Sequence, residues 1–283
     1  MSYSESAVRI SCEEDTLVGV LAQPAAPSSD TGIVIIVGGP QTRAGSHRQF
    51  VLLARALANS GFPVLRFDVR GMGDSTGNQR DFEHRSTDIR AALDALAAMG
   101  AGVRRFVLWG LCDAAAAALL YADETRDPRL AGLCLLNPWV RSDASLARTQ
   151  VKHYYGQRLL QGEFWIKLIR GQLSIVRSVM EFARKLTQAA RRSAPSAQPG
   201  FQDRMARGLA SFSGRVQLIL SGDDYTAKEF LEYAANSQSW RNLLDDPNLT
   251  RIDISGADHT FSSAEWREAV ASACIDWLKH DEK

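Results

Sequence analysis

The chain alternates short, continuous apolar runs with longer segments in which apolar residues recur at helical spacing. Continuous apolar runs are typical of strands that are buried on both faces of a sheet. Segments with apolar positions three and four residues apart indicate helices that cover such a sheet. From about residue 33 onward this pattern predicts strands within 32–38, 62–67, 105–109, 130–136, 216–220 and 250–254, and helices within 47–60, 84–99, 113–122 and 263–279.

The order of these elements predicts the architecture. Strand, helix and strand in succession, at these lengths, indicate a mostly parallel central sheet with helices on both faces, the α/β class. Residues 141–210 interrupt the alternation, because they are helical in pattern and contain no strand-like segment. We therefore expect one α/β domain over residues 1–283 with a helical cap inserted at 141–210.

Composition and charge narrow the class of protein further. With 45% hydrophobic and 23% charged residues, the chain is ordinary for a globular protein. A net charge of +1 gives no global attraction to nucleic acid, so no nucleic-acid partner is expected. The first residues lack a basic start followed by an apolar run, and no apolar run is long enough to cross a membrane. We expect a cytoplasmic protein without an integral membrane segment, and the sequence leaves its oligomeric state open.

The most specific chemical signal lies between the strand at 105–109 and the helix that follows it. Gly110-Leu-Cys112-Asp-Ala114 has the G-x-nucleophile-x-G form of a nucleophile elbow, with Cys as the nucleophile and Ala for the second Gly. Small residues are needed at both ends because the nucleophile sits on a sharp turn. The amide groups at the start of the helix favour a thiolate at Cys112. The competing interpretation is a buried structural cysteine.

Candidate partners for Cys112 follow later strands. Ser221-Gly-Asp223-Asp224 follows the strand at 216–220, and Gly256-Ala-Asp-His259 follows the strand at 250–254. Along the chain the order is nucleophile, acid and histidine. His259 would serve as the general base and then as the general acid, and an Asp would orient it. Asp224 is preferred for that position and Asp223 is the fallback. The four cysteines form no cluster with histidine, so neither a metal site nor a disulfide framework is expected.

Together these segments resemble the α/β-hydrolase superfamily over essentially the whole chain. The peptides GGPQTRAGSHRQF, FDVRGMGDSTG, WGLCDAA and SGDDYTAKEF are more narrowly similar to exosortase A system-associated hydrolases of type 1, which accompany bacterial exopolysaccharide and protein-sorting systems. The resemblance implies the α/β-hydrolase fold and a Cys-His-Asp hydrolase with a helical cap. It names no substrate.

The resemblance also implies where the oxyanion of the reaction is bound. In this fold one donor amide comes from the loop after the first buried strand, which here reads Gly38-Gly39-Pro40-Gln41. Pro40 has no N–H group, so the donor is Gly39 or Gln41. The second donor is the backbone N–H of Asp113.

These residues predict attack on an ester or thioester, giving a thioacyl-enzyme that water releases, with no metal or organic cofactor. An acyltransferase would use the same residues with another acceptor, and a non-catalytic binding protein would keep only the fold. The cap carries 13 Lys+Arg against 4 Asp+Glu, so we expect a small acyl substrate with an anionic handle, such as a CoA- or carrier-linked group. Its aromatic residues Tyr154, Tyr155 and Trp165 are the expected substrate-binding wall. Alternatively, this basic face meets only solvent or an anionic membrane surface.

Overall fold

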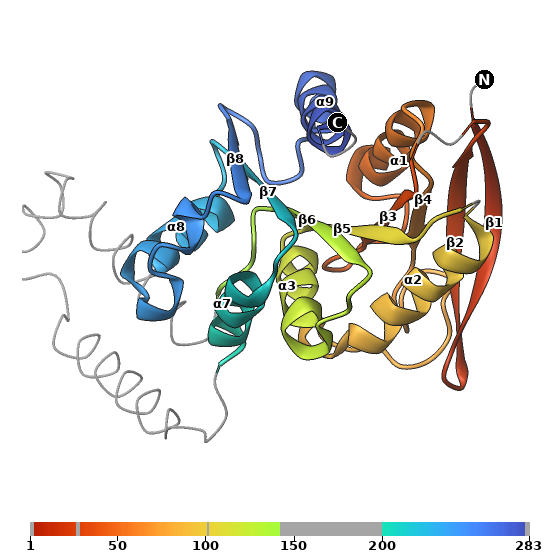
Figure 1. Ribbon diagram of the computed structural model, residues 1–283, viewed down its shortest axis with the longest axis horizontal. Coiled ribbons are helices and arrows are strands. Elements are labelled where there is room, and N and C mark those ends of the chain that lie inside the picture. The colour runs from red at the N-terminus through yellow and green to blue at the C-terminus, as the bar shows by residue number, and fades with distance from the viewer. Residues whose placement is uncertain (1–2, 27–28, 101, 142–199, 281–283) are drawn as a thin grey trace, which may run out of the picture. The chain divides into compact units, whose positions relative to one another are not determined.

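Eight strands form one sheet in the order β1-β2-β4-β3-β5-β6-β7-β8 in the computed structural model, which describes residues 3–26, 29–100, 102–141 and 200–280 (Figure 1). β1 and β2 are antiparallel to their neighbours, and all strands from β4 to β8 run parallel. The strands are β1 (Tyr3–Cys12), β2 (Asp15–Pro24), β3 (Thr31–Ile36), β4 (Val64–Phe67), β5 (Arg105–Leu111), β6 (Leu130–Leu136), β7 (Arg215–Ser221) and β8 (Leu249–Ile254).

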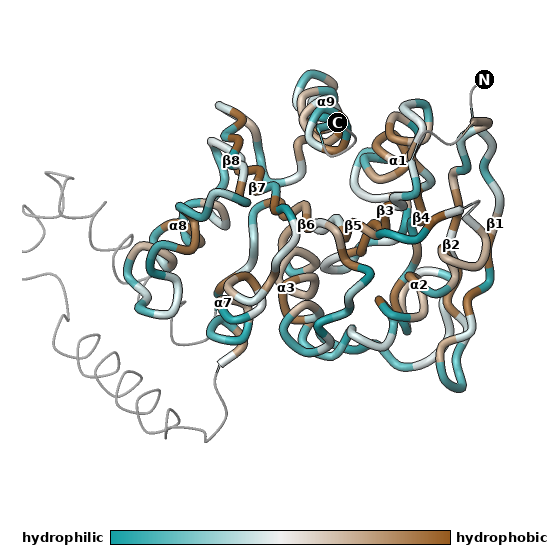
Figure 2. Tube along the Cα trace, viewed as in Figure 1, coloured by the Kyte–Doolittle hydropathy of each residue, from teal (hydrophilic) through white to brown (hydrophobic). Residues whose placement is uncertain are grey.

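Helices cover both faces of this sheet and enclose two hydrophobic cores. One core includes side chains of α1 (Gln49–Asn59) and α9 (Ala264–Lys279). The other includes α2 (Ser86–Met99), α3 (Asp113–Thr125), α7 (Phe201–Ser211) and α8 (Tyr225–Asn236). Short 3₁₀ turns lie at η1 (Ser46–Arg48), η2 (Phe82–His84), η3 (Gln238–Trp240) and η4 (Leu243–Asp245). Figure 2 shows hydrophobic residues along the central strands and a hydrophilic turn between β1 and β2.

The predicted α/β class and the mostly parallel sheet are confirmed. β3 is buried at every position, as a continuous apolar run predicts. The hairpin of β1 and β2 was not predicted, because β1 is an edge strand whose burial alternates and whose sequence mixes polar with apolar residues. Two helices after residue 200, α7 and α8, were also not predicted as separate elements.

The predicted cap at 141–210 falls mostly on residues 142–199, which lie outside the described residues. Its last part forms α7, which packs against α3 in the α/β unit. Gly208 of α7 faces the backbone of Leu119, where no side chain would fit. No helix in the described part of the chain is long and apolar enough to span a membrane.

The parallel strands determine where a site can form. Because β5, β6, β7 and β8 run in the same direction, the loops at their carboxyl ends lie at one edge of the sheet. Cys112 directly follows β5, and Asn137 directly follows β6. Asp224 comes three residues after β7, and His259 comes five residues after β8. Four loops that are distant in sequence therefore bring their polar side chains to one edge.

Candidate active site

Cys112 sits on a strained turn between β5 and α3. Its φ of 64° and ψ of −123° lie in a region that non-glycine residues rarely adopt, at a cost of about 1–3 kcal/mol. The turn is fixed by hydrogen bonds on both sides of the residue. The Cys112 N–H donates to the carbonyl oxygen of Leu136 at 2.8 Å, and its carbonyl oxygen accepts from the Trp139 N–H at 3.2 Å. The thiol is partly exposed, whereas the other three cysteines are buried.

Small residues on either side make this turn possible. A Cβ at Gly110 would lie 2.5 Å from the backbone of Ala114. Such a contact is closer than packed atoms tolerate, so the strand can approach the first turn of α3 only with glycine at this position. The Gly-x-Cys-x-Ala spacing seen in the sequence therefore reflects a steric requirement of the elbow.

His259 and Asp224 form a hydrogen-bonded pair on the neighbouring loops. Nδ1 of His259 donates to Oδ2 of Asp224 at 2.8 Å. The carboxylate is 7% exposed and also accepts from the backbone N–H groups of Thr226 and Ala227, because Asp224 caps the N-terminus of α8. These three donors fix both carboxylate oxygens, and the carboxylate in turn fixes the imidazole ring.

The charges of this pair support each other. A hydrogen bond to Asp224 and a second one to the thiol of Cys112 raise the pKa of His259 to about 10, against an opposing effect of burial. Burial raises the pKa of Asp224, but the hydrogen bond and charge of His259 outweigh it, and the net effect is a lowered pKa. With this pKa the ring is an imidazolium at neutral pH, and its Nδ1 is hydrogen-bonded to the Asp224 carboxylate.

Asp223, the alternative acid, lies elsewhere. Its side chain is 83% exposed, and its nearest ion-pair partner is Nζ of Lys228 at 3.7 Å. Its backbone N–H donates to the carbonyl oxygen of Ala257. The geometry therefore favours Asp224 over Asp223 as the partner of His259.

Comparisons with known proteins identify the family of this chain. The sequence profile of the alpha/beta hydrolase family matches residues 33–273. The chain belongs to this family. A stretch of 78 residues is 38% identical to Protein ABHD12B of Homo sapiens; it covers 28% of this chain and 20% of that protein, so the match spans about a fifth of the curated relative.

Two solved hydrolase structures share the fold. The chain is similar to the esterase Pf2001 of Pyrococcus furiosus, with a TM-score of 0.65 and 16% identity over 99% of this chain and 93% of that one. It is also similar to a dienelactone hydrolase from Anabaena variabilis ATCC 29413, with a TM-score of 0.61 and 16% identity over 99% of each chain. At these identities the likeness shows the alpha/beta hydrolase fold.

A buried hydrogen-bond network that sequence analysis missed joins the ends of β6 and β7 to the histidine loop. Asn137, which is fully buried, exchanges hydrogen bonds with Ser221: its Nδ2 donates to Oγ at 2.7 Å, and its Oδ1 accepts from the N–H at 2.9 Å. Ser221 Oγ donates to the carbonyl oxygen of Asp258, and Asn137 Nδ2 also lies 3.3 Å from the carbonyl oxygen of His259. The only signal in the sequence was a polar residue directly after a buried strand.

The histidine loop is shaped by its own carboxylate. Asp258 accepts hydrogen bonds from the N–H groups of Thr260 and Ser262, at 3.0 and 3.1 Å, and from the Ser262 hydroxyl. Burial raises its pKa, but these bonds outweigh it and leave a lowered pKa. The G-A-D-H sequence thus encodes an Asx turn that presents His259.

The loop after β3 lies against the elbow, as the alpha/beta hydrolase fold requires. A Cβ at Gly38 would lie 2.9 Å from the carbonyl oxygen of Leu111 and 3.1 Å from the amide nitrogen of Ala114. The N–H of Gly39 donates to both carboxylate oxygens of Asp113, at 2.8 and 3.0 Å. The side chain of Gln41 accepts from the N–H of Ser46. Of the residues proposed as oxyanion donors, Gly39 contacts Asp113, and it does so through the Asp113 side chain.

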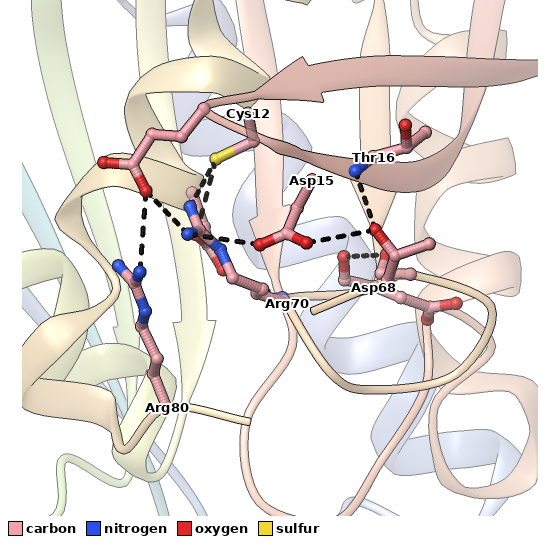
Figure 3. Close-up of polar contacts among 10 residues, drawn as sticks. Cys12, Asp15, Thr16, Asp68, Arg70 and Arg80 are labelled. Atoms are coloured by element: carbon pink, nitrogen blue, oxygen red, sulfur yellow. Dashed lines mark hydrogen bonds and ion pairs between the residues drawn. The ribbon is translucent and has the colours of Figure 1, made fainter. Parts of the chain in front are cut away.

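The glycine-rich loop at 68–77 has a structural role. Asp68 is fully buried and accepts from the backbone N–H and the guanidinium of Arg43, which joins this loop to the loop after β3. Arg70 lies between Cys12 and Asp15 at the β1–β2 hairpin, with its Nη2 2.8 Å from the Cys12 thiol (Figure 3). Thr76 N–H completes the attachment to β2 by donating to the carbonyl oxygen of Thr16. The motif that the sequence singled out thus holds the hairpin and two loops together.

One further prediction cannot be placed. Tyr154, Tyr155 and Trp165, the expected substrate-binding wall, lie outside the described residues. Within the described ranges, no group of three or more His, Cys, Asp or Glu side chains is arranged to hold a metal ion.

Proposed function

We propose that this alpha/beta hydrolase cleaves carboxylic esters or thioesters with Cys112 as the nucleophile. The observation that carries the proposal is the position of His259: its Nδ1 is hydrogen-bonded to Asp224, and the Cys112 thiol at the N-terminus of α3 is near enough to help raise the pKa of the ring. An imidazolium and a helix N-terminus beside a cysteine both favour the thiolate, which is the nucleophilic form. The substrate class is a small acyl compound, as the fold and its esterase neighbours suggest.

In the proposed reaction, the thiolate of Cys112 attacks the acyl carbon, and the carbonyl oxygen becomes a tetrahedral oxyanion. Collapse of this intermediate breaks the bond to the leaving alcohol or thiol, which takes a proton from His259. The neutral imidazole then removes a proton from water, and the hydroxide attacks the thioacyl-enzyme. Expulsion of the thiolate releases the carboxylic acid and, with the imidazolium already formed by the proton from water, regenerates the starting thiolate–imidazolium pair. Asp224 stays ionised throughout and keeps the ring in place.

Backbone amides would stabilise the oxyanion. The N–H of Asp113 is the first of α3, where helix amides lack an intrahelical acceptor, and it directly follows the nucleophile. The loop after β3 supplies the second amide, from Gly39 or from Gln41. On the resemblance of its peptides alone, we extend the proposal to acyl substrates that belong to exopolysaccharide and exosortase systems.

A panel of 4-nitrophenyl esters and acyl thioesters of increasing chain length tests the proposal, with Cys112→Ala as the control. Release of the leaving group that depends on Cys112, together with a mass increase of Cys112 by one acyl group, is the expected result. Turnover that requires an added alcohol or amine would instead identify an acyltransferase. A protein that forms no acyl adduct with any member of the panel would refute the enzymatic assignment.

A further inference from the structure

The side chain of Asp113 occupies a position that the proposed reaction needs. Its two carboxylate oxygens lie 2.8 and 3.0 Å from the backbone nitrogen of Gly39. The same residue contributes its own N–H, next to the nucleophile, to the proposed oxyanion hole. With Gly39 as the second donor of the oxyanion hole, a carboxylate that accepts from Gly39 lies where the negatively charged oxygen of the intermediate would bind.

Several groups stabilise the carboxylate at this place. Nη1 of Arg85 lies 3.5 Å from Oδ2 of Asp113 and donates to the carbonyl oxygen of Val37 at 3.0 Å. Both side chains are largely buried, with 4% of Arg85 and 16% of Asp113 exposed. Asp113 is also the first residue of α3, where the helix dipole favours a negative charge. The Asp113 carboxylate is thus held by several groups where the elbow meets the loop after β3.

One amide N–H cannot serve a carboxylate and an oxyanion at the same time. We propose that the Asp113 carboxylate fills the oxyanion position of the resting enzyme and competes with the substrate carbonyl oxygen for the Gly39 amide; this inference rests on the function proposed above. Productive binding turns the carboxylate away, toward Arg85 or solvent. The free energy needed to move the carboxylate comes from the binding of the substrate. Small esters that bind only through the reacting group are therefore poorer substrates than larger ones.

The test compares two reactions of the same thiol. Acylation of Cys112 by 4-nitrophenyl acetate passes through an oxyanion, whereas alkylation by iodoacetamide does not. Asp113→Ala removes the carboxylate and keeps the backbone N–H of residue 113. We expect its acylation rate constant to rise about tenfold or more, since single oxyanion donors are worth roughly 10²–10³-fold in rate. Its alkylation rate is expected to stay within about threefold of wild type, because no oxyanion forms in that step.

Two further variants keep the proposal falsifiable. Asp113→Asn retains the size of the side chain and an oxygen that can accept from Gly39, but it loses the charge that pairs with Arg85, so its acylation rate should fall between wild type and Asp113→Ala. Asp123→Ala is the matched control, because Asp123 lies on the same helix and pairs with Arg207 at 2.6 Å, away from the elbow. It should change neither rate.

The outcomes separate a failure of the Asp113 competition from a failure of the hydrolase proposal. Acylation of both Asp113 variants at or below the wild-type rate, with alkylation unchanged, would overturn the competition and leave the proposed hydrolase intact. If Asp113→Ala does not fold, as judged by its thermal midpoint, the acylation rate of Asp113→Asn distinguishes the two possibilities in the same way. Acylation of the Asp113 variants alone would support both proposals. If no form is acylated by any ester while Cys112 is still alkylated, the hydrolase proposal fails, and the competition fails with it.

Discussion

Nδ1 of His259 lies 2.8 Å from Oδ2 of Asp224, although 35 residues separate them in the chain. The pair is formed by two adjacent parallel strands, β7 and β8, whose carboxyl ends present an acid and a base side by side. The carboxylate also caps α8, so its position does not depend on the histidine.

This relationship predicts a difference between two neighbouring acids. Asp224→Asn should lower kcat/KM roughly 10²–10⁴-fold. The uncharged amide of asparagine cannot stabilise the imidazolium or select the histidine tautomer as the carboxylate does. Asparagine is as good an N-cap as aspartate, so the thermal midpoint should change little. Asp223→Asn, the matched control, should retain activity within about twofold, since surface substitutions away from a site have small effects. A larger loss in Asp223→Asn than in Asp224→Asn would show that the acid is misassigned.

The thiol of Cys112 should react selectively. Cys112 is partly exposed beside His259, whereas burial raises the pKa of Cys12 and of Cys134. Iodoacetamide is expected to modify Cys112 at least about tenfold faster than Cys12, Cys134 or Cys274 in the native protein, because alkylation follows exposure and thiolate content. The rate should fall in His259→Ala. Peptide mass spectrometry over a time course measures each site, and equal labelling of all four cysteines would exclude an activated Cys112.

The nucleophile and base should act as a unit. Cys112→Ala and His259→Ala are each expected to lower kcat about 10⁴-fold or more, and the double variant should be little worse than either, because one residue has no function without the other. Steady-state kinetics on one activated ester provides the comparison. Losses that multiply in the double variant would mean that the two residues work independently.

The ionised histidine should make stability depend on pH. The pKa of His259 is about 10 in the folded protein, whereas the ordinary pKa of a free histidine side chain is 6.5. A raised pKa means that the folded state binds the proton more tightly. This contribution to stability is therefore complete below about pH 6.5 and is lost as pH rises through about 10.

The thermal midpoint of wild type is accordingly expected to fall between pH 7 and pH 10 by more than that of His259→Gln. Subtracting the two profiles removes the contribution of lysine and tyrosine side chains that titrate in the same range. In Cys112→Ala the ring loses one of its partners, so the decline should begin at lower pH. Identical slopes in wild type and His259→Gln would rule out the bonded imidazolium.

The elbow should not tolerate a side chain at Gly110. Gly110→Ala would place a Cβ 2.5 Å from the backbone of Ala114, and we expect it to lower stability by about 1–3 kcal/mol and to displace Cys112. Gly200→Ala is the matched control, because among the residues that the structure describes its Cβ would meet only the end of the flexible Gln202 side chain. Denaturant unfolding and the alkylation rate of Cys112 report the two effects. An unchanged midpoint for Gly110→Ala would disprove the steric argument.

Local features of the sequence determined the central sheet and the form of the elbow. The apolar run of β3 and the helical spacing of α1 identify these elements without reference to the rest of the chain, because burial on both faces or on one face requires those patterns. Gly110 and Ala114 are likewise explained by a contact across a single turn. A steric requirement between residues a few positions apart is visible in the sequence itself.

Contacts between distant residues were decided by the tertiary structure alone. The sequence favoured Asp224 but kept Asp223 as a fallback, and only the start of α8 turns one carboxylate toward His259 and the other toward solvent. Asn137 finds Ser221 at a separation of 84 residues because β6 and β7 pair in a particular register. The contact between Asp113 and Gly39 arises in the same way, from the pairing of β3 with β5. The sequence contains the polar groups, but strand order and register determine which of them meet.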